Sequence, residues 1–186
     1  VAMKYIVTAV ALVLAVAIIA RAWTLANLND FGDPMLNAAR DGDVPGLREL
    51  LANGANSNRS DAYGNTPLSI AAHFGQTEAA ELLIACGAAV EGSGNGEMTP
   101  LQCAVYSRHP KTAACLLSHN ADPNRADKYG TTALMLAAAN GDAALVTDLL
   151  SSGADVELAD AHGWRALHIA LRSSRPAESD RGNTVM

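Results

Sequence analysis

The chain has 186 residues and a formal net charge of −6 at pH 7, and 49% of its residues are hydrophobic. An acidic balance repels the phosphate backbone, so we do not expect nucleic acid as a partner. The length suits a single folded domain.

The first 22 residues differ in composition from the rest. Lys4 precedes an apolar run over residues 5–20 that only Thr8 interrupts, and Ala20-Arg21-Ala22 then gives an Ala-x-Ala pattern. A positive charge, an apolar run and such a site are typical of a secretory signal peptide. The alternative is an uncleaved membrane anchor, although the run is short of the roughly 20 residues that a full span needs. A buried helix is a third reading. The first two predict export of the rest of the chain.

After a predicted linker over residues 23–32, the sequence repeats at intervals of 33 residues. Leucines, small residues, pairs of aliphatic residues and turn residues all recur in the same phase. The clearest markers are Leu68, Leu101, Leu134 and Leu167, followed by Ala71, Ala104, Ala137 and Ala170. Several features recurring together at one period indicate a repeat array.

One copy contains the signals of two short helices. Thr66 and Pro67 suit the N-cap and the first position of a helix, and the apolar residues that follow lie at helical spacing. Gly75 suits the left-handed residue that ends this helix. A second helix carries the apolar stripe of residues 82–84. Because one copy cannot bury its own apolar face, we expect the copies to stack into an all-α solenoid of helix-turn-helix units with β-turn fingers.

These segments resemble ankyrin repeats. The resemblance rests on the sequences Gly-Asn-Thr-Pro-Leu at 64–68, Thr-Pro-Leu at 99–101 and Asp-Lys-Tyr-Gly-Thr-Thr-Ala-Leu at 127–134, and on the endings at 120–124 and 153–156. It covers residues 33–172 and implies an array of about four to five repeats.

The chain departs from the family pattern in two places. The histidine that follows Thr-Pro-Leu in the family is present only as His168, where the resemblance implies a structural hydrogen bond to the backbone. Ser69, Gln102 and Met135 stand at this position in the other copies. The third copy has Glu97 in place of the turn glycine, which predicts an irregular finger.

The predicted organisation follows the marker leucines. Residues 1–22 are the signal peptide or anchor, 23–32 the linker, 33–172 the repeats and 173–186 a disordered polar tail. The copies are expected at 33–60, 61–93, 94–126, 127–159 and, as a partial copy without its second helix, 160–172.

We find no pattern for catalysis, a cofactor or a metal ion. The histidines lack ligand spacing, and no nucleophile elbow or phosphate-binding loop is present. Cys86, Cys103 and Cys115 are odd in number and lack a framework spacing. Cys103 and Cys115 fall on the two helices of one copy, where they either form a bridge or act as small buried hydrophobic residues. Cys86 is expected to be the most exposed.

The resemblance implies that a partner protein binds the concave face, which finger tips and inner-helix edges form. The candidate partner-binding residues are Tyr63, Asn65, His73, Phe74, Met98, Tyr106, Lys128, Tyr129, Asn140, His162 and Trp164. Six of the eight aromatic residues fall on this face or, for Trp23, in the linker. Tyrosine and tryptophan dominate binding hot spots, so this placement favours an interface. Alternatively, Tyr63 and Tyr129 only brace neighbouring fingers.

The sequence therefore predicts a monomeric, non-catalytic interaction module that is exported to a bacterial periplasm and assists or regulates an exported enzyme. The alternative is a scaffold that residues 1–22 tether to the inner membrane, facing the periplasm, where it binds an integral membrane protein. A redox or enzymatic protein is the third hypothesis, and it depends on Cys103 and Cys115.

Overall fold

The computed structural model of the chain describes residues 32–92 and 98–173. The predicted signal peptide or anchor, nearly all of the linker and of the tail, and Glu97 in the third finger lie outside these residues. Within the described ranges, no helix is both long enough and apolar enough to cross a membrane.

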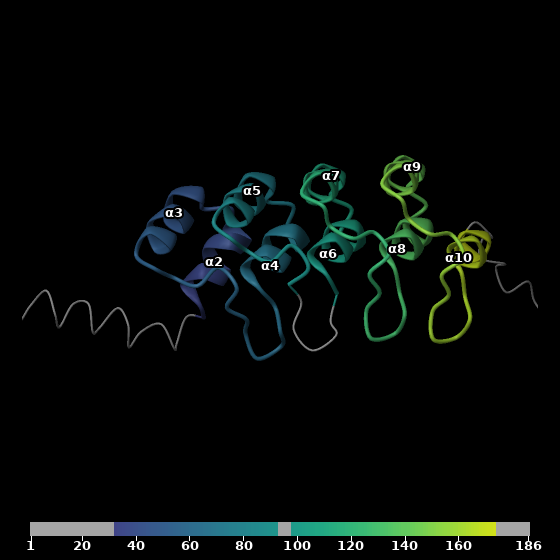
Figure 1. Cartoon of the computed structure of the whole chain (residues 1–186), viewed down its shortest axis with the longest axis horizontal. Helices are drawn as coiled ribbons and strands as arrows, with labels where there is room; N and C mark the ends of the chain where they lie inside the picture. Colours follow the sequence, from purple (N-terminus) through teal and green to yellow (C-terminus); the bar gives the residue numbers. More distant parts are fainter. Residues whose placement is uncertain (1–31, 93–97, 174–186) are drawn as a thin grey trace, which may run out of the picture.

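The described residues form pairs of short antiparallel helices. The first helices of the pairs are α2 (Pro34–Asp41), α4 (Pro67–His73), α6 (Pro100–Tyr106), α8 (Ala133–Asn140) and α10 (Ala166–Ser173). The second helices are α3 (Val44–Ala52), α5 (Thr77–Ala85), α7 (Pro110–Ser118) and α9 (Ala143–Ser151). We call the first set inner helices and the second set outer helices. Figure 1 shows them as two stacked rows, with the loops that we call fingers extending from the inner row, away from the outer row. The predicted all-α solenoid is confirmed.

Threonines start three of the inner helices, as the sequence indicated. The hydroxyl oxygens of Thr66, Thr99 and Thr132 each accept a hydrogen bond from the backbone N–H three residues later, at 3.2 to 3.4 Å. Each bond satisfies one of the free N–H groups of the first helical turn. After α4 the chain reverses at Gly75, whose φ is +72°, so the left-handed residue predicted there is confirmed.

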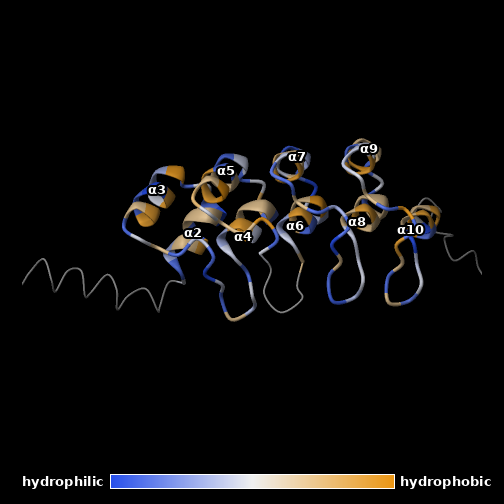
Figure 2. Cartoon of the chain, in the orientation of Figure 1, coloured by the Kyte–Doolittle hydropathy of each residue, from blue (hydrophilic) through white to orange (hydrophobic). Residues whose placement is uncertain are grey.

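The core runs through the array between the two rows. Leu68, Leu101 and Leu134 of the inner helices are 1 to 3% exposed, and the outer helices bury a leucine in every described pair. Figure 2 shows the apolar residues concentrated on the helices and the polar ones on the fingers. Because α10 has no outer helix beside it in the described chain, Leu167, in the same register as Leu134, is 68% exposed.

Candidate functional site

An aspartate at the base of three fingers shapes the finger tip. Asp61 Oδ1 accepts hydrogen bonds from Tyr63 N at 2.8 Å and from Asn65 N at 2.9 Å. Asp127 and Asp160 make the same pair of bonds to the N–H groups two and four residues later, at 2.8 to 2.9 Å. The turn fixes the backbone, so the residues at the tip are presented from rigid loops.

The predicted aromatic residues lie at the tips and at the ends of the inner helices, and they are exposed. Tyr63 is 79% exposed, Tyr106 and Tyr129 are 58%, Phe74 is 46% and Trp164 is 37%. Large apolar side chains that are this exposed keep an unfavourable contact with water and add little to the stability of the hydrophobic core. Tyrosine and tryptophan are residue types that are enriched in binding hot spots.

A groove between α4 and α6 brings five of the predicted residues together. It has a volume of about 330 Å³ and we call it the inner groove; the predicted residues along it are Asn65, His73, Phe74, Met98 and Tyr106. The rings of His73 and Phe74 meet edge to face, with centroids 5.0 Å apart. His73 Nδ1 lies 2.9 Å from the hydroxyl of Ser107, so a hydrogen bond between neighbouring repeats orients the imidazole. The His73 imidazole is therefore tied to the neighbouring repeat at the edge of the inner groove.

The other predicted residues lie elsewhere. Lys128 and Tyr129 lie on the finger that precedes α8, where Lys128 Nζ is 5.2 Å from the ring centroid of Tyr129. His162 and Trp164 line a separate hollow of about 610 Å³ at the last finger, where the Arg172 guanidinium lies 5.4 Å from the Trp164 ring centroid. The Asn140 side chain has a structural role. Its Nδ2 donates a hydrogen bond to the Val105 carbonyl at 2.8 Å, which ties α8 to α6.

The cysteines of the described chain are free thiols. Burial raises the pKa of Cys103, beside the inner groove, to about 11, and burial together with the charge of Glu81 raises the pKa of Cys115. A thiol with a raised pKa stays protonated at neutral pH and is a poor nucleophile. Cys86 is exposed, as predicted. No group of three His, Cys, Asp or Glu side chains that could hold a metal ion occurs within residues 32–92 and 98–173.

The family model described as Ankyrin repeats (3 copies) matches residues 35–127 and 123–178, which is more than half of the chain. The chain belongs to the ankyrin-repeat family. Ankyrin arrays are protein–protein interaction modules, and the chain contains such a module. None of the curated proteins matches its sequence.

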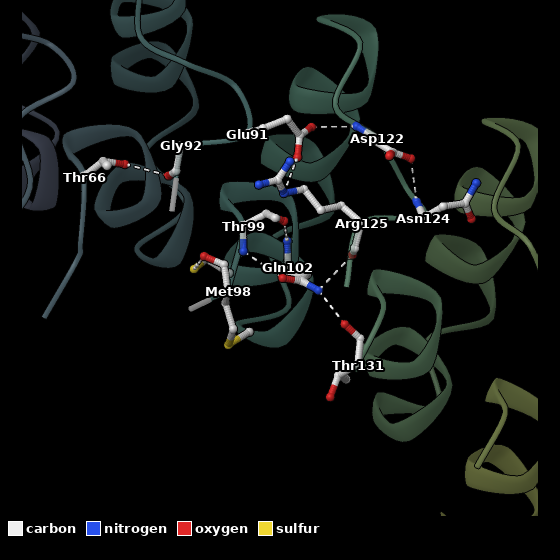
Figure 3. Close-up of polar contacts among 11 residues, drawn as sticks. Thr66, Glu91, Gly92, Met98, Thr99, Gln102, Asp122, Asn124, Arg125 and Thr131 are labelled. Carbon is white, nitrogen blue, oxygen red and sulfur yellow. Dashed lines mark hydrogen bonds and ion pairs between the residues drawn. The ribbon is translucent and has the colours of Figure 1, made fainter. Parts of the chain in front are cut away.

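The ankyrin position after Thr-Pro-Leu is filled in different ways along this array. His168 accepts a hydrogen bond at Nδ1 from the Arg165 N–H at 3.1 Å, which confirms the predicted backbone bond. Gln102 is 1% exposed and bonds at both ends of its amide (Figure 3). Its Oε1 accepts from Thr99 N at 2.7 Å, and its Nε2 donates to the carbonyls of Arg125 at 3.1 Å and Thr131 at 2.6 Å. Gln102 therefore connects its helix to the next ankyrin finger, a role that the sequence analysis missed.

Asparagine clamps join the segments that follow the outer helices of consecutive ankyrin repeats. Asn58 Nδ2 donates to the Gly87 carbonyl at 2.9 Å, and its Oδ1 accepts from Ala89 N at 2.6 Å. Asn124 makes the same two bonds, 2.9 and 2.6 Å long, to the following repeat. The spacing of these two asparagines on the repeat period was the signal in the sequence that could have revealed them.

Glu91 occupies the clamp position between the other two. Its Oε1 accepts from Asp122 N at 2.7 Å, but a carboxylate has no N–H to donate to the carbonyl that an asparagine would reach. Its Oε2 is buried without a hydrogen-bond partner and lies 3.6 Å from Arg125 Nε (Figure 3). The clamp is therefore only half formed at this junction.

We expect Glu91→Asn to raise the free energy of unfolding by about 1 kcal/mol, because it restores the second bond of the clamp and removes the buried oxygen. Loss of the ion pair with Arg125 reduces this gain in stability only slightly, since Arg125 is half exposed. Urea unfolding followed by circular dichroism measures the change. The matched control is Asn58→Glu, which should lower stability. A destabilised Glu91→Asn variant would mean that the ion pair dominates.

The lowered pKa values of two finger aspartates, Asp61 and Asp160, indicate that the fold loses stability in acid. Burial raises the pKa of Asp61, but hydrogen bonds from the Asn65 side chain and from backbone N–H groups of the finger outweigh burial and hold the pKa below its usual value. The backbone N–H of Trp164 is the main cause of the lowered pKa of Asp160. A lowered pKa stabilises the fold above the ordinary pKa of about 4, and this stabilisation disappears as the pH falls through the lower folded pKa.

We therefore expect Asp61→Asn, which keeps the shape of the turn, to have a lower Tm than the natural chain at pH 7. The difference should shrink as the pH falls below about 4, where the natural carboxyl also becomes neutral. Thermal unfolding of both proteins across this range checks the sign. An equal difference in Tm between the two proteins at both ends of the pH range would show that the charge of Asp61 contributes nothing to stability.

Proposed function

We propose that this ankyrin array is a non-catalytic module that binds another protein through its concave face. The inner groove and the exposed tips of the fingers form that face. The observation that carries the proposal is the convergence of Phe74, Tyr106 and the oriented imidazole of His73 on the inner groove. A rigid, preformed surface loses little conformational entropy on binding, so aromatic anchors can act at nearly full strength.

We further propose that the array works in a bacterial periplasm, where it assists or regulates an exported enzyme. The support for export is the sequence of residues 1–22, with Lys4, the apolar run and the Ala20-Arg21-Ala22 pattern. The same apolar run favours a second candidate, in which residues 1–22 stay in the membrane and the concave face holds an integral membrane protein. The intact mass of the protein in the soluble and membrane fractions separates the two, because only the first predicts a soluble species lacking residues 1–22.

Site-specific photocrosslinking in the native host tests the concave face. A photoreactive amino acid at Tyr106 should give a specific crosslinked product, and the same group at Ala85, an exposed residue of the outer helix α5, should not. Phe74→Ala should then reduce the Tyr106 product, because it removes a neighbouring anchor of the groove. Equal crosslinking from Tyr106 and Ala85, or none from Tyr106, would contradict this use of the concave face.

A further inference from the structure

The C-terminal end of the array exposes a second, strongly apolar groove. It lies between α8, α9 and α10, has a volume of about 510 Å³, and we call it the C-terminal groove. Its lining includes Leu167, Val156 and Leu150, which are 68%, 49% and 43% exposed, together with Val146. Thr147 provides the only polar side chain of the lining among the described residues. This lining predicts an apolar occupant.

The C-terminal groove lies where the repeat pattern would place the next outer helix. One repeat earlier, α9 packs on α8 and buries Leu145 and Leu149 completely. The positions that line the groove in α9 and α10 correspond to residues that are covered inside the array: Leu167 corresponds to Leu134, which is 3% exposed, and Val146 to Ala113, which is fully buried. The groove thus continues the interface that joins the repeats.

The sequence that follows α10 lacks the side chains to fill the groove as an outer helix. In the repeat register, Pro176 corresponds to Pro110 at the start of α7. The positions of the buried Ala113 and Leu116 are then taken by Ser179 and Gly182. Neither residue can replace a buried leucine, since burial of apolar area is what holds an outer helix in place. The occupant must therefore supply its own leucine.

Among the described residues, the other end of the array offers no matching surface for a second copy to add on in line. Met35 and Leu47 of the first helix pair are buried, and the described residues of α2 and α3 include no exposed large hydrophobic side chain. A copy stacked head to tail would place the C-terminal groove against helices whose described residues expose no large hydrophobic side chain. This asymmetry favours a helix from a different protein.

We propose that the C-terminal groove binds an amphipathic helix of a partner protein, which takes the place of the missing outer helix. The helix would carry a leucine facing α10 and a small or aliphatic residue one turn before it, as Leu116 and Ala113 do in α7. Recognition of this kind, an apolar helix face in a groove, needs no charged contacts. The site is separate from the concave face, so the two proposals stand or fall independently.

The test uses a helix from the chain itself as the probe. A fluorescent peptide with the sequence of residues 142–152 carries α9, and a hydrocarbon staple between the exposed positions 144 and 148 offsets the weak helicity of so short a peptide. Fluorescence anisotropy with the purified full chain should show saturable binding. Leu149→Glu in the peptide should weaken it at least about tenfold, because the leucine is the buried anchor.

The protein variant Leu167→Glu should weaken binding to a similar degree without unfolding the array, because Leu167 is already exposed. Ala85→Glu adds the same charge on an exposed part of α5 and is the matched control. Absence of binding, or an equal loss in both variants, would overturn the proposal.

Two further measurements identify a different occupant. Light scattering that shows a dimer of the full chain, dissociated by Leu167→Glu, would assign the groove to a second copy. Slow hydrogen exchange over residues 174–186 that Leu167→Glu accelerates would assign it to the end of this chain. Either result would overturn the partner helix, whereas a monomer with fast exchange in that segment supports it.

Discussion

Leu101→Ala is expected to lower the free energy of unfolding by about 2–5 kcal/mol, the range for large-to-small changes in a packed core. Leu101 lies on α6, in the middle of the array, and is 1% exposed. Inner helices α4 and α8 pack against α6 from both sides. Because a cavity there cannot close by a shift of one neighbour alone, the lost contacts and the remaining empty volume both reduce the stability.

The control for this prediction lies at the same register of the last copy. Leu167 is 68% exposed, and we expect Leu167→Ala to change stability by less than about 1 kcal/mol. Urea unfolding of both variants, followed by circular dichroism, gives the comparison. If the array unfolds in steps, the change in stability is taken from the transition of the central repeats. Equal losses would show that the residues following α10 cover Leu167 as well as the neighbouring helices cover Leu101.

The sequence was sufficient to predict the fold because the repeat multiplies each weak signal. A single Thr-Pro-Leu is short, but its recurrence in register with the alanines of the inner helices defines which face each helix buries. Thr66 and Gly75 then mark the start and the reversal of a helix through local chemistry alone, without reference to the rest of the fold. Both were confirmed for this reason.

The candidate site could be predicted only as a list of positions. The register places His73 and Tyr106 at equivalent points of neighbouring inner helices, but the inner groove between them depends on rotamers and on the Ser107–His73 bond, which no periodicity reveals. Asn140 shows the opposite case. Its position predicts a free edge residue, whereas its amide is used for an interhelical bond. Contacts between repeats depend on pairs of side chains that a one-dimensional pattern does not specify.

Gln102 is the clearest example of such a contact, and it gives the second large prediction. We expect Gln102→Met to lower the free energy of unfolding by about 2–4 kcal/mol, because it removes the three hydrogen bonds that the buried amide makes to backbone groups. Thr99 N loses its acceptor, the Arg125 carbonyl loses its donor, and the Thr131 carbonyl keeps only the bond from Asp127 N at 3.0 Å. These two carbonyls lie at either side of the Asp127 finger turn, so the finger should also become more mobile.

Methionine is the appropriate replacement because the array already accepts it at this register. Met135 is 1% exposed at the equivalent position of α8, so the shape fits and any loss reports the hydrogen bonds rather than a cavity. Urea unfolding measures the stability, and hydrogen exchange across residues 126–132 measures the finger. Gln102→His restores the residue typical of the family and should keep most of the stability, since an imidazole can accept from Thr99 N and donate to one carbonyl. A Gln102→Met protein as stable as the natural chain would mean that water satisfies these backbone groups, and that stacking of the helices alone sets the position of the finger.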